Sequence, residues 1–247
     1  MPTEIFSSII IFLGSLIYAT FGFGDAMFAM PFLSIILGIK TATPLMTLNG
    51  FTLALILFIK HRTSINWKIT FRLIIASAFG IPIGIYFLKN GNEYVAKIIL
   101  GSIITSVAIY NLFIRKNNSE NKLPANAIYI FGFIAGVLGG AFNTGGPAIV
   151  VFGTLNGWTP MQFMSTLQGY FLPSDTIILI GQLSAGLLTK NVFHYYLVGL
   201  PFLLVGLLVG SKLRKKIPEG KFTKLIFWLL LCIGIMFILR AVLLFQA

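Results

Sequence analysis

Gly139-Gly140-Ala141-Phe142-Asn143-Thr144-Gly145-Gly146-Pro147 interrupts a long apolar segment of this 247-residue chain and decides how the chain is built. Glycine adopts backbone angles that other residues cannot, and proline removes a helical hydrogen bond, so we expect a helix to break here. The freed amides have no partner in lipid. Broken backbone at membrane depth is therefore expected only where it is buried in protein or lines a watery cavity.

The same stretch has the features of an anion site. Successive glycine amides form a concave nest that suits an anion, and a helix that begins beyond the nest adds the positive end of its dipole. Asn143 and Thr144 place polar side chains at the same point. We therefore expect a substrate site formed by Asn143, Thr144, Gly145 and Gly146. A valine at Gly145 should fill the nest without unfolding the protein.

The composition predicts a membrane protein. Hydrophobic residues make up 57% of the chain and charged residues 10%, with a mean hydropathy of +0.94, whereas soluble domains carry about 25% charged residues. The net charge of +12 comes from bases in short loops between apolar runs, which favours topology signals over nucleic-acid binding. The lone Cys232 lies in an apolar run, so we expect no disulfide framework, metal cluster or cofactor.

Apolar runs divide the chain into two halves. The run Ile5–Ile39 is interrupted at Gly22-Phe23-Gly24-Asp25; it is too long for one span and short for two, so we expect a pair of short or re-entrant helices. The polar stretch 117–124 connects a first transmembrane repeat over 1–116 to a second over 125–247. The remaining apolar runs are Pro44–Ile59, Phe71–Leu88, Ala96–Ile114, Ala125–Ala141, Pro147–Leu155, Met161–Gln182, Val192–Val209 and Leu225–Phe245.

The second half repeats the first at a constant spacing. Gly50, Gly80 and Pro82 recur 119 residues later as Gly169, Gly199 and Pro201, and Phe23 recurs as Phe142. Matches of glycine and proline at one offset favour an internal duplication, which is characteristic of transporters.

The charges predict how the two repeats are oriented. Dense basic loops lie at 60–72, 115–122 and 212–224. All three fall on the cytoplasmic face only if each half has an odd number of apolar elements, and this inverts the second half. We therefore expect an all-α integral membrane protein with two inverted repeats. Each repeat has a glycine-broken helix or re-entrant pair plus three spanning helices, about eight to ten membrane elements in total, and both termini lie outside the inner membrane.

Asp25 and Asp175 are the acids that lie away from the loops. A carboxyl inside a membrane is costly and indicates function. Asp25 follows Gly24 at the first break, where it is either a helix N-cap or a functional group. Asp175 lies in a long apolar segment, where burial favours the protonated form and suits proton coupling; a hydrogen bond to a neighbouring helix is the alternative.

Two polar residues occupy nearly equivalent places in the two halves. Asn49 precedes Gly50, and Gln168 precedes Gly169. Such side chains often form hydrogen bonds between membrane helices. Their symmetry about a central site favours substrate contact instead.

The glycine-rich first break ending in Pro31, its recurrence at Asn143–Pro147 and the two-half layout resemble the sulfite exporter TauE/SafE family of membrane permeases over nearly the whole chain. The resemblance implies small sulfur-containing anions, such as sulfite and organosulfonates, as substrates. Gly22-Phe23-Gly24 fits the first motif of the family, which adds Gly24 to the binding residues, but Asp25 and Ala26 stand where further glycines are usual. An acid there would repel an anion, so we place the anion mainly at the second break and consider Asp25 for the coupling proton.

Two other functions fit parts of the sequence. Gly22-Phe23-Gly24-Asp25 matches the Gly-x-Gly-Asp pattern of intramembrane aspartyl proteases, with Asp175 as a second acid. Those enzymes have a Tyr-Asp motif before that pattern, however, whereas here the second acid comes later and follows Ser174. A passive anion channel is the closer alternative. We predict a non-enzymatic, proton-coupled secondary transporter of small sulfur-containing anions in the lipid bilayer of the inner membrane, without nucleic acid, and we leave a homodimer open.

Overall fold

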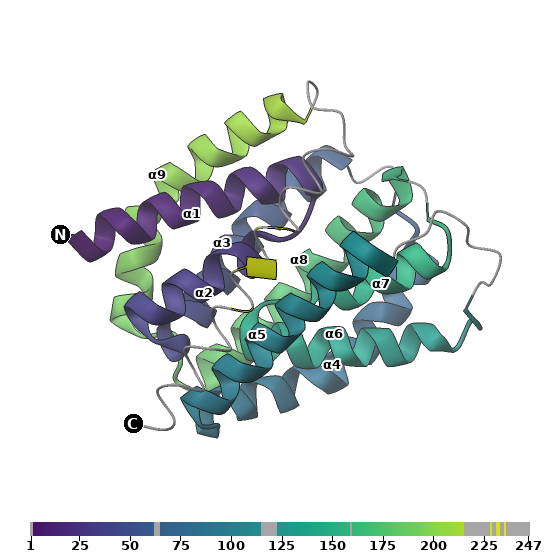
Figure 1. Cartoon of the computed structure of the whole chain (residues 1–247), viewed down its shortest axis with the longest axis horizontal. Coiled ribbons are helices and arrows are strands. Elements are labelled where there is room, and N and C mark those ends of the chain that lie inside the picture. Colours follow the sequence, from purple (N-terminus) through teal and green to yellow (C-terminus); the bar gives the residue numbers. More distant parts are fainter. Residues whose placement is uncertain are drawn as a thin grey trace.

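The computed structural model describes residues 2–61, 65–114, 123–158 and 160–214, together with 228, 231, 232 and 235. Helices dominate these residues, and no strand occurs among them (Figure 1). Most of the predicted segment Leu225–Phe245 and of the connection 117–124 lies outside the described residues. The helices are α1 (Pro2–Phe21), α2 (Asp25–Leu37), α3 (Ile39–His61), α4 (Trp67–Asn90), α5 (Glu93–Ile109), the π-helical turn η2 (Tyr110–Ile114), α6 (Ala127–Phe142), α7 (Gly146–Leu155), α8 (Pro160–Ser184) and α9 (Lys190–Leu213).

Both predicted breaks are present. α1 ends at Phe21 and α2 begins at Asp25, and α6 ends at Phe142 before α7 begins at Gly146. One boundary differs: α3 begins at Ile39 and contains Pro44, which was expected to start the helix. The reason is that the first turn forms before the proline, since the Ala42 amide donates to the Gly38 carbonyl at 2.9 Å.

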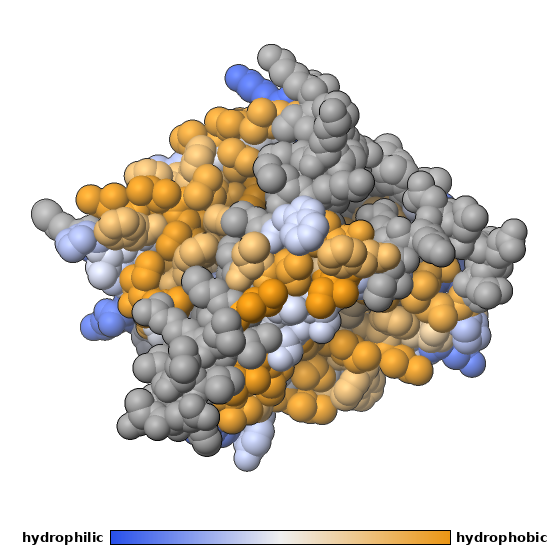
Figure 2. Space-filling view, in the orientation of Figure 1, coloured by the Kyte–Doolittle hydropathy of each residue, from blue (hydrophilic) through white to orange (hydrophobic). Residues whose placement is uncertain are grey.

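The outer surface of the helices suits lipid. α1, α4, α9 and the part of α3 up to Ile59 are long and apolar enough to cross a membrane, and α2 and α6 are shorter apolar helices. Large apolar side chains are exposed on these helices, among them Ile5, Phe79, Tyr86 and Leu208. Figure 2 shows apolar side chains over much of the coloured surface on the face that it displays. A soluble protein rarely exposes so much apolar surface, so this is a membrane protein.

α4 and α6 pack closely and run parallel (Figure 1). Gly80 lies against Phe133 and Val137, and one turn later Gly84 lies against Val137 and Ala141. A Cβ atom on either glycine would overlap the α6 backbone. Small residues let two membrane helices approach to backbone contact, which explains the glycines here.

α1 and α9 form a second parallel pair of the same kind. Gly206 lies against Phe12, and Gly210 lies against Leu16, so both helices advance in the same direction. The Thr20 hydroxyl of α1 also donates to the Gly210 carbonyl of α9 at 3.3 Å. The two helices that precede the breaks, α1 and α6, are thus each held by a helix from the other half of the chain.

α3 and α8 cross at the centre in an antiparallel arrangement. The Gln182 amide donates to the Thr47 hydroxyl at 3.1 Å. Further along α3, Gly50 faces Asp175, which precedes Gln182 on α8. α4 also packs on α8, and α9 packs on α3. Of these two central helices, α8 is hydrogen-bonded to the first break and α3 to the second.

Candidate functional site

Two glycines with left-handed backbone angles make the first break. Gly22 has a φ of 84° and Gly24 a φ of 98°, angles at which a side chain would be strained. The Gly22 amide donates to the Tyr18 carbonyl at 2.6 Å and closes α1. Gly24, rather than Asp25, is the N-cap residue of α2, and no side chain caps this helix. Asp25 is therefore the first residue of α2, and its carboxyl interacts with the backbone amides of Ala26 and of Asp25 itself, while Oδ2 has no hydrogen-bond partner in the described part of the chain.

Asn143 makes the second break. Its φ of 55° is positive, the one such value for a non-glycine residue in the described part of the chain, and asparagine tolerates this region better than most residues. The Asn143 amide donates to the Gly139 carbonyl at 2.8 Å, and the Thr144 amide donates to Leu138 at 3.3 Å. The side-chain Nδ2 donates to the Met46 carbonyl of α3 at 2.9 Å. Asn143 thus ends α6 and ties this break to α3.

The amides of Gly145 and Gly146 are available to a ligand. Neither forms a backbone hydrogen bond within the described ranges, as expected where a helix begins. A Cβ atom on Gly146 would lie 3.2 Å from Phe171 Cζ, whereas one on Gly145 would lie 2.6 Å from the Ala135 carbonyl oxygen. A valine at Gly145 would therefore press on the α6 backbone, contrary to the expectation that it fills the nest and leaves the fold intact.

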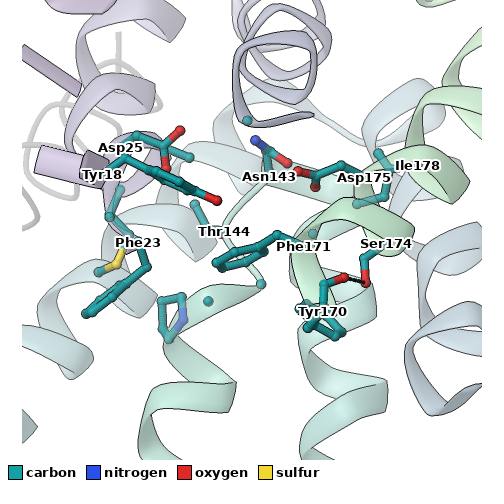
Figure 3. Close-up of a pocket in the computed structure, with 18 residues that line it drawn as sticks. Tyr18, Phe23, Asp25, Asn143, Thr144, Tyr170, Phe171, Ser174, Asp175 and Ile178 are labelled. Carbon is teal, nitrogen blue, oxygen red and sulfur yellow. Dashed lines mark hydrogen bonds between the residues drawn. The ribbon is translucent and has the colours of Figure 1, made fainter. Parts of the chain in front are cut away.

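Both breaks line one pocket, which Figure 3 shows in close-up. The cavity has a volume of about 30 Å³. One water occupies about 10–15 Å³ of such a volume, so the pocket has room for a small group and not for a bulky substrate. The lining residues are Tyr18, Phe23, Gly24, Asp25, Ala26, Met27, Gly50, Gly139, Asn143, Thr144, Gly145, Gly146, Pro147, Tyr170, Phe171, Ser174, Asp175 and Ile178.

The two acids inside apolar segments meet at this pocket. Asp25 is 6% exposed and Asp175 is 5% exposed. A Cβ atom built on Gly50 would lie 3.2 Å from both Asp175 Oδ2 and Asn143 Nδ2, so these two side chains converge on one point of α3. No lysine, arginine or histidine is among the described residues that line the pocket.

Two buried polar atoms at the pocket lack a hydrogen-bond partner in the described part of the protein, Asp25 Oδ2 and Thr144 Oγ1. Thr144 is 2% exposed. Buried polar atoms are nearly always hydrogen-bonded, so unpartnered atoms at a cavity indicate a place where a ligand or water binds.

The remaining two predicted site residues, Asn49 and Gln168, do not line the pocket. Gln168 is fully buried behind it. Its Nε2 donates to the Gly22 carbonyl at 3.2 Å, and its Oε1 accepts from the Tyr18 hydroxyl at 3.2 Å. Asn49 Nδ2 donates to Met46 Sδ at 3.8 Å. Gln168 therefore supports the first break and a pocket residue, Tyr18, from outside the cavity.

Sequence reasoning missed the aromatic wall of the pocket, Tyr18, Phe23, Tyr170 and Phe171. The Phe171 ring lies 6.0 Å from the Tyr18 ring and 5.6 Å from the Tyr170 ring, between centroids. The Tyr170 hydroxyl donates to Ser77 Oγ of α4 at 3.1 Å. In the sequence, aromatic residues of an apolar run that face a cavity look the same as those that face lipid or core, so no signal distinguished these four.

Comparison with known proteins gives one family. The family model described as Sulfite exporter TauE/SafE matches residues 7–237, which is most of the chain. No curated protein and no solved structure matches the chain. With the helical membrane fold and the glycine breaks, this match shows that the chain belongs to the sulfite exporter TauE/SafE family of membrane transporters.

Proposed function

We propose that this protein is a secondary transporter that moves small sulfur-containing anions across the inner membrane in a proton-coupled cycle. The observation that carries the proposal is the meeting of two helix breaks, two helix N-termini and both intramembrane acids at one pocket. Broken helices whose N-termini face a central site are a recurring way for transporters to bind anions. Membership of a sulfite exporter family supports the substrate class.

The anion site of this proposal is the second break. The free amides of Gly145 and Gly146 lie at the positive end of the α7 dipole, and the unpartnered Thr144 hydroxyl adds a donor. Asn143 shapes the site, because its side-chain amide is already bound to the Met46 carbonyl. Gly24, the N-cap residue of α2, also lines the pocket, so the N-terminus of α2 adjoins the same cavity.

The coupling follows from the charges. Two ionised carboxylates at the same small pocket would repel an anion, and no base among the described lining residues offsets them. Binding of the anion therefore favours protonation of these acids. We assign the coupling proton to Asp175, which lies in the middle of α8, with Asp25 as the second candidate. Gln168 and Asn49 act behind the pocket, on its geometry.

We further propose the inverted arrangement of two repeats, 1–116 and 125–247 joined by 117–124, with eight to ten membrane elements. Parallel packing of α4 on α6 and of α1 on α9, with α3 antiparallel to α8, supports it. In that arrangement α4 and α6 both begin at the basic loops, and both termini lie outside. Rocking of the halves about the pocket gives alternating access.

Labelling of single cysteines tests this topology. Cysteines at Asn66, Asn118 and Glu219 should react only with a reagent on the cytoplasmic side, and one at Gly186 only with a reagent outside; Asn118 and Glu219 lie outside the described residues. Labelling of any of the first three from outside would contradict the inverted arrangement.

Transport into proteoliposomes tests the function itself. Labelled sulfite and simple sulfonates should accumulate above equilibrium when a pH gradient is imposed and should only equilibrate without one. A channel would give flux without accumulation. An aspartyl protease would cleave peptides and move no anion, and the family membership favours transport over that alternative.

A further inference from the structure

The pocket is lined by two chemically different groups. Gly145, Gly146 and Thr144 offer hydrogen-bond donors. Asp25, which is only 6% exposed, offers a carboxyl whose Oδ2 has no hydrogen-bond partner in the described part of the chain. In Figure 3, Asp25 and Tyr18 lie on one side of Thr144, and Asn143 and Asp175 lie on the other.

We propose that the preferred substrate is a zwitterion, a small sulfonate that also carries an ammonium group. Its sulfonate binds the amides at the second break, and its ammonium binds the Asp25 carboxylate at the first. The inference rests on the proposed anion transport and names the substrate class of that same pocket.

Hydrogen bonding at Asp25 supports an ammonium. An ionised carboxylate only accepts hydrogen bonds, and an ammonium supplies three donors and the opposite charge. A simple anion supplies neither, so it leaves Asp25 Oδ2 unpaired or requires a proton on it. A charge buried without a partner is costly, so a substrate that brings the partner has an advantage over one that does not.

The aromatic wall supports the same conclusion. The rings of Tyr18, Phe23 and Phe171 line the pocket together with the acids. Ring faces carry negative charge density and attract cations, particularly where water is excluded. Carboxyl and aromatic side chains together are therefore the expected surroundings of an ammonium.

The two acids have different surroundings, which separates their roles. Asp175 Oδ2 and the Asn143 side-chain amide lie close to the same point of Gly50, whereas Asp25 Oδ2 is a buried atom with no hydrogen-bond partner among the described residues. Asp25 is therefore the better partner for a substrate cation. Asp175 keeps the proton that drives accumulation.

A matched series of sulfonates tests the proposal with purified protein in lipid nanodiscs at neutral pH. Aminoethanesulfonate, hydroxyethanesulfonate and ethanesulfonate share one anionic group and differ at the other end. Aminoethanesulfonate should bind about tenfold tighter than hydroxyethanesulfonate, as expected for a charge-assisted hydrogen bond in a buried site. Ethylammonium, which lacks the sulfonate, should bind weakly.

Asp25→Asn is the decisive variant because it removes the charge and keeps the shape. It should abolish the preference for the amino compound. Ethanesulfonate should still bind, at least as tightly as to the wild type because a repelling charge is gone, and this binding also shows that the variant is folded. Glu4→Gln is the matched control, since Glu4 lies on α1 against His194 at 2.7 Å and does not line the pocket. It should leave the preference unchanged.

The outcomes are distinguishable. Equal binding of all three sulfonates by the wild type, or an amino preference that survives Asp25→Asn, would overturn the zwitterion proposal and leave anion transport intact. Ethylammonium binding as tightly as aminoethanesulfonate would also overturn it. Binding of no sulfonate and no sulfite would instead refute the proposed function.

Discussion

The two breaks share a scaffold and differ in chemistry. Each is held by the long central helix of the other half: Gln168 of α8 donates to the Gly22 carbonyl at 3.2 Å, and Thr43 of α3 donates to the Ala141 carbonyl at 3.4 Å. Gly22 and Ala141 are 119 residues apart, which is the spacing of the repeated glycines and prolines. Carbonyls at equivalent positions of the two halves thus each accept a hydrogen bond from the central helix of the other half, although the donor residues differ.

The next equivalent pair shows the divergence. Asp25 and Thr144 are also 119 residues apart, and both line the pocket. One position presents a carboxyl and the other a hydroxyl followed by two glycines. In the proposed arrangement, duplication supplies two helix N-termini at one cavity, and the difference at this pair assigns a proton or a cation to one break and the anion to the other. The predictions below test that division.

The largest effect is expected when the second break is given the acid of the first. Thr144→Asp places a carboxylate beside the amides of Gly145 and Gly146, where it competes for them and repels an anion, so sulfite and sulfonate binding should be lost. Thr144→Asn has a similar size and no charge, and it should keep measurable binding. Titration calorimetry on both variants makes the comparison. Equal binding by the two variants would place the anion elsewhere.

Removing the acids should uncouple transport without stopping it. Asp175→Asn cannot change charge with pH, so the variant should lose accumulation driven by a pH gradient and keep exchange of substrate for substrate. Asp25→Asn tests the second candidate in the same assay. Full accumulation in both variants would exclude these carboxyls as the coupling groups, and a channel would show neither accumulation nor this split.

The breaks were readable from the sequence because their cause is local. Gly22 and Gly24 adopt backbone angles that few other residues tolerate, so their presence in an apolar run indicates a bend wherever the chain folds. Asp25 and Asp175 were readable for a similar reason, because an acid in an apolar run is costly unless it has a use. Both acids lie at the pocket with the breaks.

The rest depends on contacts between distant parts of the chain. Gln168 lies one residue from Gly169 in the sequence, yet only its bonds to Gly22 and Tyr18 show that it supports the pocket from behind. Phe171 belongs to an apolar run, and from the sequence its ring could face lipid as well as the pocket. The packing of α1, α3 and α4 around α8 decides which of its side chains face the pocket. The hydrophobic pattern of the sequence does not contain this information.

A smaller effect is expected at Asn143, which combines a backbone angle with a hydrogen bond. Asn143→Ala strains the φ of 55° and removes the bond to the Met46 carbonyl, whereas Asn143→Gly removes only the bond. Anion affinity should fall in both variants and further in the alanine variant, with a hydrogen bond contributing about 0.5–1.5 kcal/mol. Unchanged affinity in both would show that this side chain does not shape the site.

The smallest effect is expected at Thr43, and it tests whether the two breaks are held equally. Thr43→Val keeps the volume and removes one long hydrogen bond, 3.4 Å to the Ala141 carbonyl. Such bonds between membrane helices average about 0.6 kcal/mol, so the unfolding midpoint should fall slightly. Thr176→Val is the control, because among the described residues the Thr176 hydroxyl bonds the Leu172 carbonyl of its own helix, at 2.7 Å, and no other helix.

Gln168→Leu completes the comparison. It removes two bonds, to Gly22 and from Tyr18, and leaves the Tyr18 hydroxyl without that acceptor. An unsatisfied buried group costs about 1–3 kcal/mol, so this variant should lose more stability than Thr43→Val and should also weaken substrate binding through Tyr18 and the first break. Thermal unfolding in nanodiscs measures the first quantity and sulfonate titration the second. Thr43→Val could instead lower both stability and sulfonate binding more than Gln168→Leu does. The second break would then depend more on α3 than the first break depends on α8, and the bond from Asn143 to Met46 would not be enough to hold the anion site.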